Sequence, residues 1–142
     1  MRLFCVALMS CTISLMAEDA PQVLKPIDPA TKHPSGVNKK LMSDDKTYGY
    51  SENNPILVGS KDEFGGPKAE RDYLNSLLGP EGKPIRFKRL FSGGNSPDGK
   101  PLDCYEITIS NGTKVRLWIS MYHPKNKPER QPAPVGFYKK RK

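Results

Sequence analysis

The sequence holds two side chains that could form a nucleophilic pair, Cys104 and His123. A cysteine is activated when a contacting base takes its proton. The predicted strand register puts these residues on opposite faces of a sheet, with His123 beyond the paired region. We therefore expect Cys104 to be a small buried side chain beside Trp118, and we predict no catalytic residue here.

Paired carboxylates could provide a general acid and a general base, and Asp103 and Glu106 are the nearest pair on a predicted strand. Their odd separation sends the two side chains to opposite faces of that strand. The histidines, His33 and His123, lie far apart, and no set of candidate ligands has the spacing of a metal site. The sequence predicts neither a metal nor a cofactor.

The positive charge is concentrated at the C-terminal end. The net charge is +8, yet residues 18–122 hold 15 Lys and Arg against 14 Asp and Glu. The chain ends in Lys139, Lys140, Arg141 and Lys142. This basic tail could bind anionic membrane lipids, lipopolysaccharide or acidic glycan. A solvated tail that only aids solubility is the alternative.

The first 17 residues have the pattern of an export signal. Arg2 precedes an uncharged apolar run over 3–16, which is shorter than the roughly 20 residues of a membrane span. We predict a signal peptide that is cut after Ala17. A second possibility is lipidation of Cys11, because 8–11 (LMSC) resembles a lipoprotein signal. A third is an uncleaved anchor or a buried terminal helix.

Export shapes the expectations for the rest of the chain. Removal of residues 1–17 leaves Cys104 as the sole thiol, so no internal disulfide can form. Residues 18–47 hold four prolines and scattered apolar residues, which predicts a flexible linker. One domain then occupies 48–138, before the basic tail at 139–142. Because the protein is expected to be exported, a nucleic-acid partner is not expected.

The start of the domain reads as a strand and a helix. Residues 54–59 form a short strand entered through proline, which suits the edge of a sheet. Apolar residues at three-to-four spacing predict a helix over 67–78, with Pro67 in its first turn and a stop at Gly79. Glu70, Arg71 and Asp72 are expected to lie mostly off that apolar stripe.

The second half reads as strands over 83–91, 102–110 and 113–122, with a loop at 92–101. Parity fixes the register of the last two strands. A three-residue loop, Ser110–Gly112, puts glycine at the left-handed bulge position and gathers the apolar residues on one face. The pairs on that face are Ile109–Thr113, Ile107–Val115, Tyr105–Leu117 and Asp103–Ile119. The pairs on the other face are Glu106–Arg116, Cys104–Trp118 and Thr108–Lys114.

These elements predict an α+β fold. We expect a small antiparallel sheet of three or four strands with one helix packed on its apolar face.

Six stretches of the chain resemble a family of small exported or lipoprotein-like proteins of Bacteroidota-like bacteria. The stretches are 48–59 (YGYSENNPILVG), 66–82 (GPKAERDYLNSLLGPEG), 85–90 (IRFKRL), 102–109 (LDCYEITI), 115–122 (VRLWISMY) and 134–137 (PVGF). This resemblance implies an exported protein and no established activity. Some members are labelled 2-dehydro-3-deoxyphosphooctonate aldolase. That label is judged wrong here, because the aldolase is a TIM barrel of roughly 200 residues or more.

The chain departs from the family after Phe91. Ser92–Gly94 stands where members often have a cysteine-containing segment, so no role of those cysteines carries over.

The resulting hypothesis is a non-catalytic, exported, envelope-associated accessory or binding domain for an envelope protein or glycan. The alternative is a small periplasmic hydrolase or transferase-like enzyme, with its residues around the helix entry and the 92–101 loop. A third reading is an electrostatic tether through 139–142.

Overall fold

The computed structural model describes residues 22–28, 32–60, 62 and 64–142. The expected signal peptide and Cys11 lie outside the described residues. The elements in chain order are β1 (Val37–Asn38), η1 (Lys39–Leu41), β2 (Ile56–Leu57), α1 (Gly66–Asn75), β3 (Leu77–Leu78), β4 (Arg86–Asn95), β5 (Pro101–Thr108), β6 (Lys114–Ser120), η2 (Pro128–Arg130) and β7 (Tyr138–Lys140). Among these described residues, none of the helices has the length and apolar character of a membrane span.

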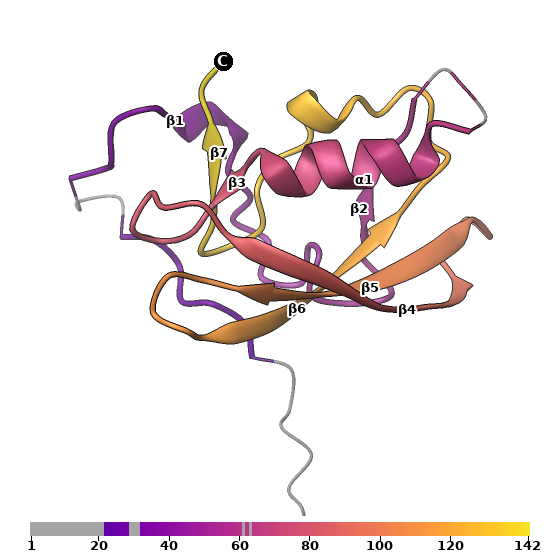
Figure 1. The fold of residues 1–142 in the computed structure, drawn as a ribbon, viewed down its shortest axis with the longest axis horizontal. Coiled ribbons are helices and arrows are strands. Elements are labelled where there is room, and N and C mark those ends of the chain that lie inside the picture. Colours follow the sequence, from indigo (N-terminus) through magenta and orange to yellow (C-terminus); the bar gives the residue numbers. More distant parts are fainter. Residues whose placement is uncertain (1–21, 29–31, 61, 63) are drawn as a thin grey trace, which may run out of the picture.

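The fold is α+β, as expected, and it contains two sheets. The larger has the order β2-β6-β5-β4 and the smaller has the order β1-β7-β3. Figure 1 shows α1 above the larger sheet, with β7 and the smaller sheet beside the helix. Strand β2 lies at an edge, as its proline predicts, but it runs parallel to β6 rather than antiparallel.

The β5–β6 hairpin has the predicted register. Ile107 pairs with Val115 on one face, and Cys104 pairs with Trp118 on the other. The amide of Ile109 donates to the carbonyl of Thr113 at 3.0 Å, which closes the three-residue loop. Gly112 has φ +87°, the left-handed conformation that this loop requires.

Helix α1 starts near the predicted residue but ends three residues early. Leu77 and Leu78 continue its apolar spacing, yet they form β3 and pair with β7. Ser76 is the residue that closes the helix, and its amide donates to the carbonyls of Leu74 and Tyr73. The helical spacing of apolar residues therefore continues past the end of the helix into strand β3.

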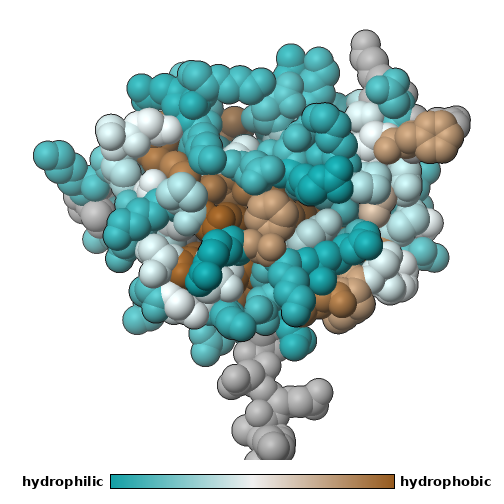
Figure 2. All heavy atoms as spheres, viewed as in Figure 1, coloured by the Kyte–Doolittle hydropathy of each residue, from teal (hydrophilic) through white to brown (hydrophobic). Residues whose placement is uncertain are grey.

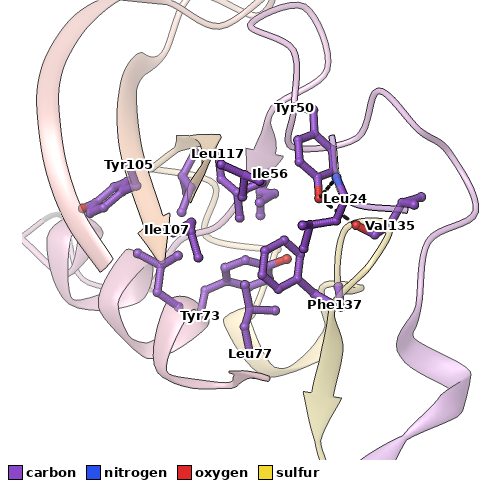
Figure 3. Close-up of a cluster of buried hydrophobic side chains, with 14 of the residues drawn as sticks. Leu24, Tyr50, Ile56, Tyr73, Leu77, Tyr105, Ile107, Leu117, Val135 and Phe137 are labelled. Carbon is purple, nitrogen blue, oxygen red and sulfur yellow. Dashed lines mark hydrogen bonds between the residues drawn. The ribbon is translucent and has the colours of Figure 1, made fainter. Parts of the chain in front are cut away.

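One core joins the helix to the larger sheet. Side chains from α1, β5 and β6 pack together with residues of the C-terminal segment (Figure 3). Fully buried members include Tyr73, Leu74, Ile107, Leu117, Ile119 and Phe137. Figure 2 shows hydrophilic residues over most of one side of the molecule, with hydrophobic residues visible near its centre and in smaller groups toward the edge.

The expectation of a flexible linker over 18–47 is wrong for the residues that the structure describes. Leu24 belongs to the main core, and Val37 is buried in a smaller cluster. The Tyr50 hydroxyl accepts from the Leu24 amide at 3.3 Å and donates to the Val135 carbonyl at 2.7 Å. Buried apolar residues held by long-range hydrogen bonds make this segment part of the folded unit. The prolines shape its path instead of preventing its packing.

The expected loop over 92–101 is also shorter than predicted. Strand β4 continues through the glycines to Asn95, and β5 begins at Pro101. The connecting turn is closed by the Ser96 amide, which donates to the Lys100 carbonyl at 2.8 Å, and Gly99 has φ +79°. Glycine and serine do not favour a strand, so here the pairing with β5 overrides local preference.

Candidate functional site: an aromatic and basic sheet face

The face of the larger sheet that points away from α1 carries side chains in three rows across β4, β5 and β6. The register gives these rows as Arg86–Thr108–Lys114, Lys88–Glu106–Arg116 and Phe91–Cys104–Trp118. We call these nine residues the outer sheet face. Successive side chains on one face of a strand lie about 7 Å apart, and strands lie about 4.8 Å apart. The rows therefore form one continuous surface.

The aromatic row is partly open to solvent. The rings of Phe91 and Trp118 meet edge to face with centroids 5.7 Å apart, and Phe91 is 48% exposed. Cys104 lies between them and is buried, as expected. Burial raises the pKa of the Cys104 thiol, so the thiol stays protonated and unreactive.

The two charged rows are dominated by cations. Arg86, Lys88, Lys114 and Arg116 are all exposed. Glu106 is half-buried among them, and its Oε1 atom lies 3.0 Å from Lys114 Nζ. Glu106 faces Arg116 in the ladder, as predicted, but its ion pair is with the diagonal neighbour Lys114.

His123 does not lie where the sequence placed it. Its Nε2 atom lies 3.0 Å from the Ser120 hydroxyl, and Ser120 shares the face of Cys104 and Trp118. Tyr122 has φ +70°, and the His123 amide donates to the Val58 carbonyl at 3.1 Å, so this backbone irregularity puts His123 on the Ser120 side of the sheet. The prediction of opposite faces for Cys104 and His123 was therefore wrong, but the raised pKa of Cys104 keeps it an unreactive thiol.

Ser120, His123 and Asp98 stand in the order of a serine–histidine–aspartate relay. His123 Nδ1 lies 3.4 Å from Asp98 Oδ2. Ser120 is completely buried, however, and its hydroxyl also contacts the Pro101 carbonyl at 3.0 Å. A nucleophile must reach its substrate, so this network fastens the 96–100 turn to β6 and is not a reaction centre.

Two carboxyl groups are buried together between α1 and the larger sheet. Glu70 Oε2 accepts a 2.8 Å hydrogen bond from the Tyr105 hydroxyl, and Asp103 Oδ2 pairs with Arg89 at 3.1 Å. Both carboxyl groups are fully buried, and each has one oxygen without a donor in the described structure. Asp103 and Glu106 do lie on opposite faces, as predicted.

Glu70 was wrongly expected on the solvent side of the helix. It lies three and four residues before Tyr73 and Leu74, so the helical period already places it on the buried stripe. Burial and the neighbouring Asp103 carboxylate raise the pKa of Glu70 to about 8, although the Tyr105 hydrogen bond opposes the shift. This carboxyl pair has no route to a substrate, because both side chains are covered on all sides.

The basic tail is a strand in the structure. Lys139 and Lys140 belong to β7, in the middle of the smaller sheet, and Lys139 is fully buried. Lys140 Nζ donates to the Asn75 carbonyl at 2.6 Å, and Lys142 Nζ lies 3.8 Å from Glu129. The expectation of a solvated tail at 139–142 is therefore wrong for Lys139, whereas Lys140 belongs to the strand but is exposed. Arg141 and Lys142 remain exposed.

Comparison with protein-family models, curated proteins and solved structures finds no match to this chain. The resemblance to the exported bacterial family therefore stays an expectation from the sequence. The candidate site rests on the geometry of the outer sheet face.

Proposed function

We propose that the protein is an exported, envelope-associated binding domain that holds an acidic glycan on its outer sheet face. The observation that carries the proposal is the open aromatic row beside two rows of exposed cations. This surface lies on three hydrogen-bonded strands, of which β5 has a ladder on both sides. A rigid sheet can present it without ordering a loop on binding.

The aromatic row suits the apolar faces of sugar rings. Phe91 and Trp118 expose flat hydrocarbon surface that is poorly hydrated, and covering this surface releases water. Their edge-to-face contact fixes both rings before a ligand arrives. This fixed arrangement lowers the entropy lost on binding.

The charged rows suit carboxylate or sulfate groups on the same chain. Arg86, Lys88 and Arg116 attract anions, and Arg116 can hold a carboxylate through two parallel hydrogen bonds. Glu106 lies in the centre of the cations and can accept a hydrogen bond from a sugar hydroxyl. Phosphate oxygens have no proton to offer it, so a carboxylate here favours a glycan over a nucleic acid.

Export agrees with such a ligand. The signal pattern at residues 1–17 is the basis for expecting the periplasm or outer envelope. Acidic polysaccharides are more common ligands than nucleic acids in that setting. The tail contributes less than expected to this function, because Lys139 and Lys140 already have partners within the protein.

The test uses the only tryptophan in the sequence, Trp118. Polygalacturonate should change the Trp118 fluorescence in a saturable way, and added salt should weaken the binding. Neutral dextran should cause no change. Single-stranded oligothymidylate is the control, because it is a polyanion whose sugar rings carry no free hydroxyl groups along the chain. If it bound as tightly as polygalacturonate, or more tightly, the assignment of a glycan ligand would be wrong.

Charge reversal locates the surface. We expect Lys88→Glu and Arg116→Glu each to weaken polygalacturonate binding about tenfold, equivalent to ~1.4 kcal/mol. Lys39→Glu is the matched control, because Lys39 is an exposed lysine of η1 beside the smaller sheet. If all three variants bound equally, the ligand would not lie on the outer sheet face.

A further inference from the structure

A serine and a lysine meet where α1 ends against the smaller sheet. Ser76 closes the helix, and its hydroxyl oxygen accepts a hydrogen bond from Lys139 Nζ. The β3–β7 ladder produces this meeting, because Leu77 pairs with Lys139 and the Lys140 amide donates to the Ser76 carbonyl at 2.9 Å. Sixty-three positions separate the two residues in sequence, so the juxtaposition is a property of the fold.

Lys139 is a buried amine that has neutral partners. Its Nζ donates to the Pro128 carbonyl at 2.9 Å and lies 4.2 Å from the centre of the Tyr73 ring. The negative charge of Glu129 favours the protonated form of Lys139, but the carboxylate of Glu129 forms its ion pair with Lys142. Burial lowers the pKa of Lys139 to about 8. A neutral amine is the form of lysine that can accept a proton.

Ser76 is reachable from solvent. It is half-buried, and together with Lys139 it lines a surface hollow of about 460 Å³. The other charged residues of the hollow are three cations and two carboxylates, Lys140, Arg141, Lys142, Asp72 and Glu129. A volume in this range accepts a small ligand, and the cations favour one that carries negative charge.

We propose that Ser76 and Lys139 form a serine–lysine pair that hydrolyses an acyl ester bearing a negative charge. Lysine serves as the general base of such pairs, in place of histidine. The inference is independent of the outer sheet face, because the pair lies on the smaller sheet and uses none of those nine residues.

The reaction balances with water as the sole co-reactant. The Ser76 proton passes to neutral Lys139 Nζ as Oγ bonds to the ester carbonyl carbon. The tetrahedral intermediate then breaks its bond to the alcohol oxygen, and that oxygen takes the proton from Nζ. A water molecule repeats the sequence on the acyl-serine, which frees the acid and restores the Ser76 hydroxyl.

One hydrogen bond must change before attack. In the structure the Ser76 hydroxyl donates to the Tyr73 carbonyl at 2.5 Å. When Lys139 is neutral, rotation about the Ser76 side chain turns the proton toward Nζ instead. The exchange replaces one acceptor by another, so it leaves no buried donor without a partner.

The experiment combines a covalent probe with an ester assay on the full chain. A fluorophosphonate should label one residue, and peptide mapping of the wild-type protein should place the adduct on Ser76. Hydrolysis of p-nitrophenyl hemisuccinate should exceed that of p-nitrophenyl acetate, and its rate should rise with pH to a plateau above about 8. Mapping on the wild-type chain needs no variant and so does not depend on variant folding.

Variants separate catalysis from packing. Ser76→Ala and Lys139→Arg should each lower hydrolysis at least 100-fold, because arginine keeps the cation but cannot lose its proton. Ser110→Ala, an exposed serine of the hairpin loop, is the control that should retain the rate. The proposal fails if no adduct forms between pH 6 and 10, if the adduct maps elsewhere, or if folded Lys139→Arg hydrolyses the ester like the wild type.

Discussion

At the residue scale, the protein places two acids where solvent cannot reach them. Glu70 and Asp103 are buried together, Glu70 with the Tyr105 hydroxyl and Asp103 with the half-exposed Arg89 as partner. One positive charge faces two carboxyl groups, so ionising both would leave a negative charge in the core. A proton retained by Glu70 resolves the conflict and can bridge the two carboxyl oxygens that have no donor.

The pH dependence of stability tests this arrangement. The pKa of Glu70 lies near 8 in the folded protein and near its ordinary value of 4.5 in the unfolded chain. Between these values the folded state holds a proton that the unfolded state has released, so stability falls as pH rises from 4.5 to 8. We expect a loss on the order of 1–3 kcal/mol, measured by urea unfolding at pH 5 and pH 8.

The substitution Glu70→Gln removes the titrating group and keeps the shape. This variant should lose much less stability than the wild type between pH 5 and pH 8. Glu52→Gln, which changes an exposed carboxylate, should keep the wild-type slope. A wild-type slope in Glu70→Gln would show that Glu70 is ionised throughout.

Leu24 is a second residue whose surroundings carry a prediction. It packs on the core, while its neighbour Val23 is 47% exposed. Leu24→Ala should lower the free energy of unfolding by about 2 kcal/mol, because it leaves a cavity under Gly136. Val23→Ala should change stability by less than about 0.5 kcal/mol in the same urea titration. Equal effects would mean that the 22–28 segment does not stay docked.

At the element scale, the β5–β6 hairpin depends on one backbone conformation. Gly112→Ala should destabilise the protein by about 1 kcal/mol, because φ +87° strains any residue with a Cβ atom. Open space surrounds Gly112, so the cost comes from the backbone alone. Gly93→Ala is the matched control, since Gly93 has an ordinary φ and room for a Cβ. Thermal unfolding of the two variants should therefore differ.

The β5–β6 hairpin was predictable because the residues that determine its register lie close together in the sequence. Alternation of apolar residues and one glycine fix the register without reference to the rest of the chain. Leu77 and Leu78 were assigned to the helix, because nothing near them in sequence reveals their partner β7. Lys139 was missed as a buried residue for the same reason. Its partners, Ser76 and Pro128, become neighbours only in the folded chain.

The outer sheet face could be predicted from the sequence only in part. The predicted register already put Cys104 beside Trp118 and Glu106 beside Arg116. The residues that β4 contributes to this face could not be predicted, because the bulge in β4 between Arg89 and Phe91 shifts the pairing by one residue. Without that bulge, Phe91 would point to the face of α1. The aromatic row therefore depends on a β-bulge that no sequence pattern predicts.

At the scale of the whole molecule, the C-terminal residues close the structure. Deleting 138–142 should remove β7 from between β1 and β3 and lower the unfolding midpoint by more than about 10 °C. Deleting Lys142 alone removes an exposed side chain and should leave the midpoint unchanged. Differential scanning calorimetry compares the two. A truncation at 137 that melts like the full chain would show that the smaller sheet contributes no stability.

The same central place of β7 sets the order in which the molecule can assemble. Val37 pairs with Lys140, so the β1–β7 ladder closes a loop of roughly 100 residues. The β5–β6 hairpin, with its short loop, can form within microseconds, whereas the ladder must wait for a slow encounter between distant segments. Refolding followed by pulsed hydrogen exchange should therefore protect the hairpin amides before those of β7. The part of the outer sheet face that lies on β5 and β6 would be in place before the hollow beside Ser76 has formed.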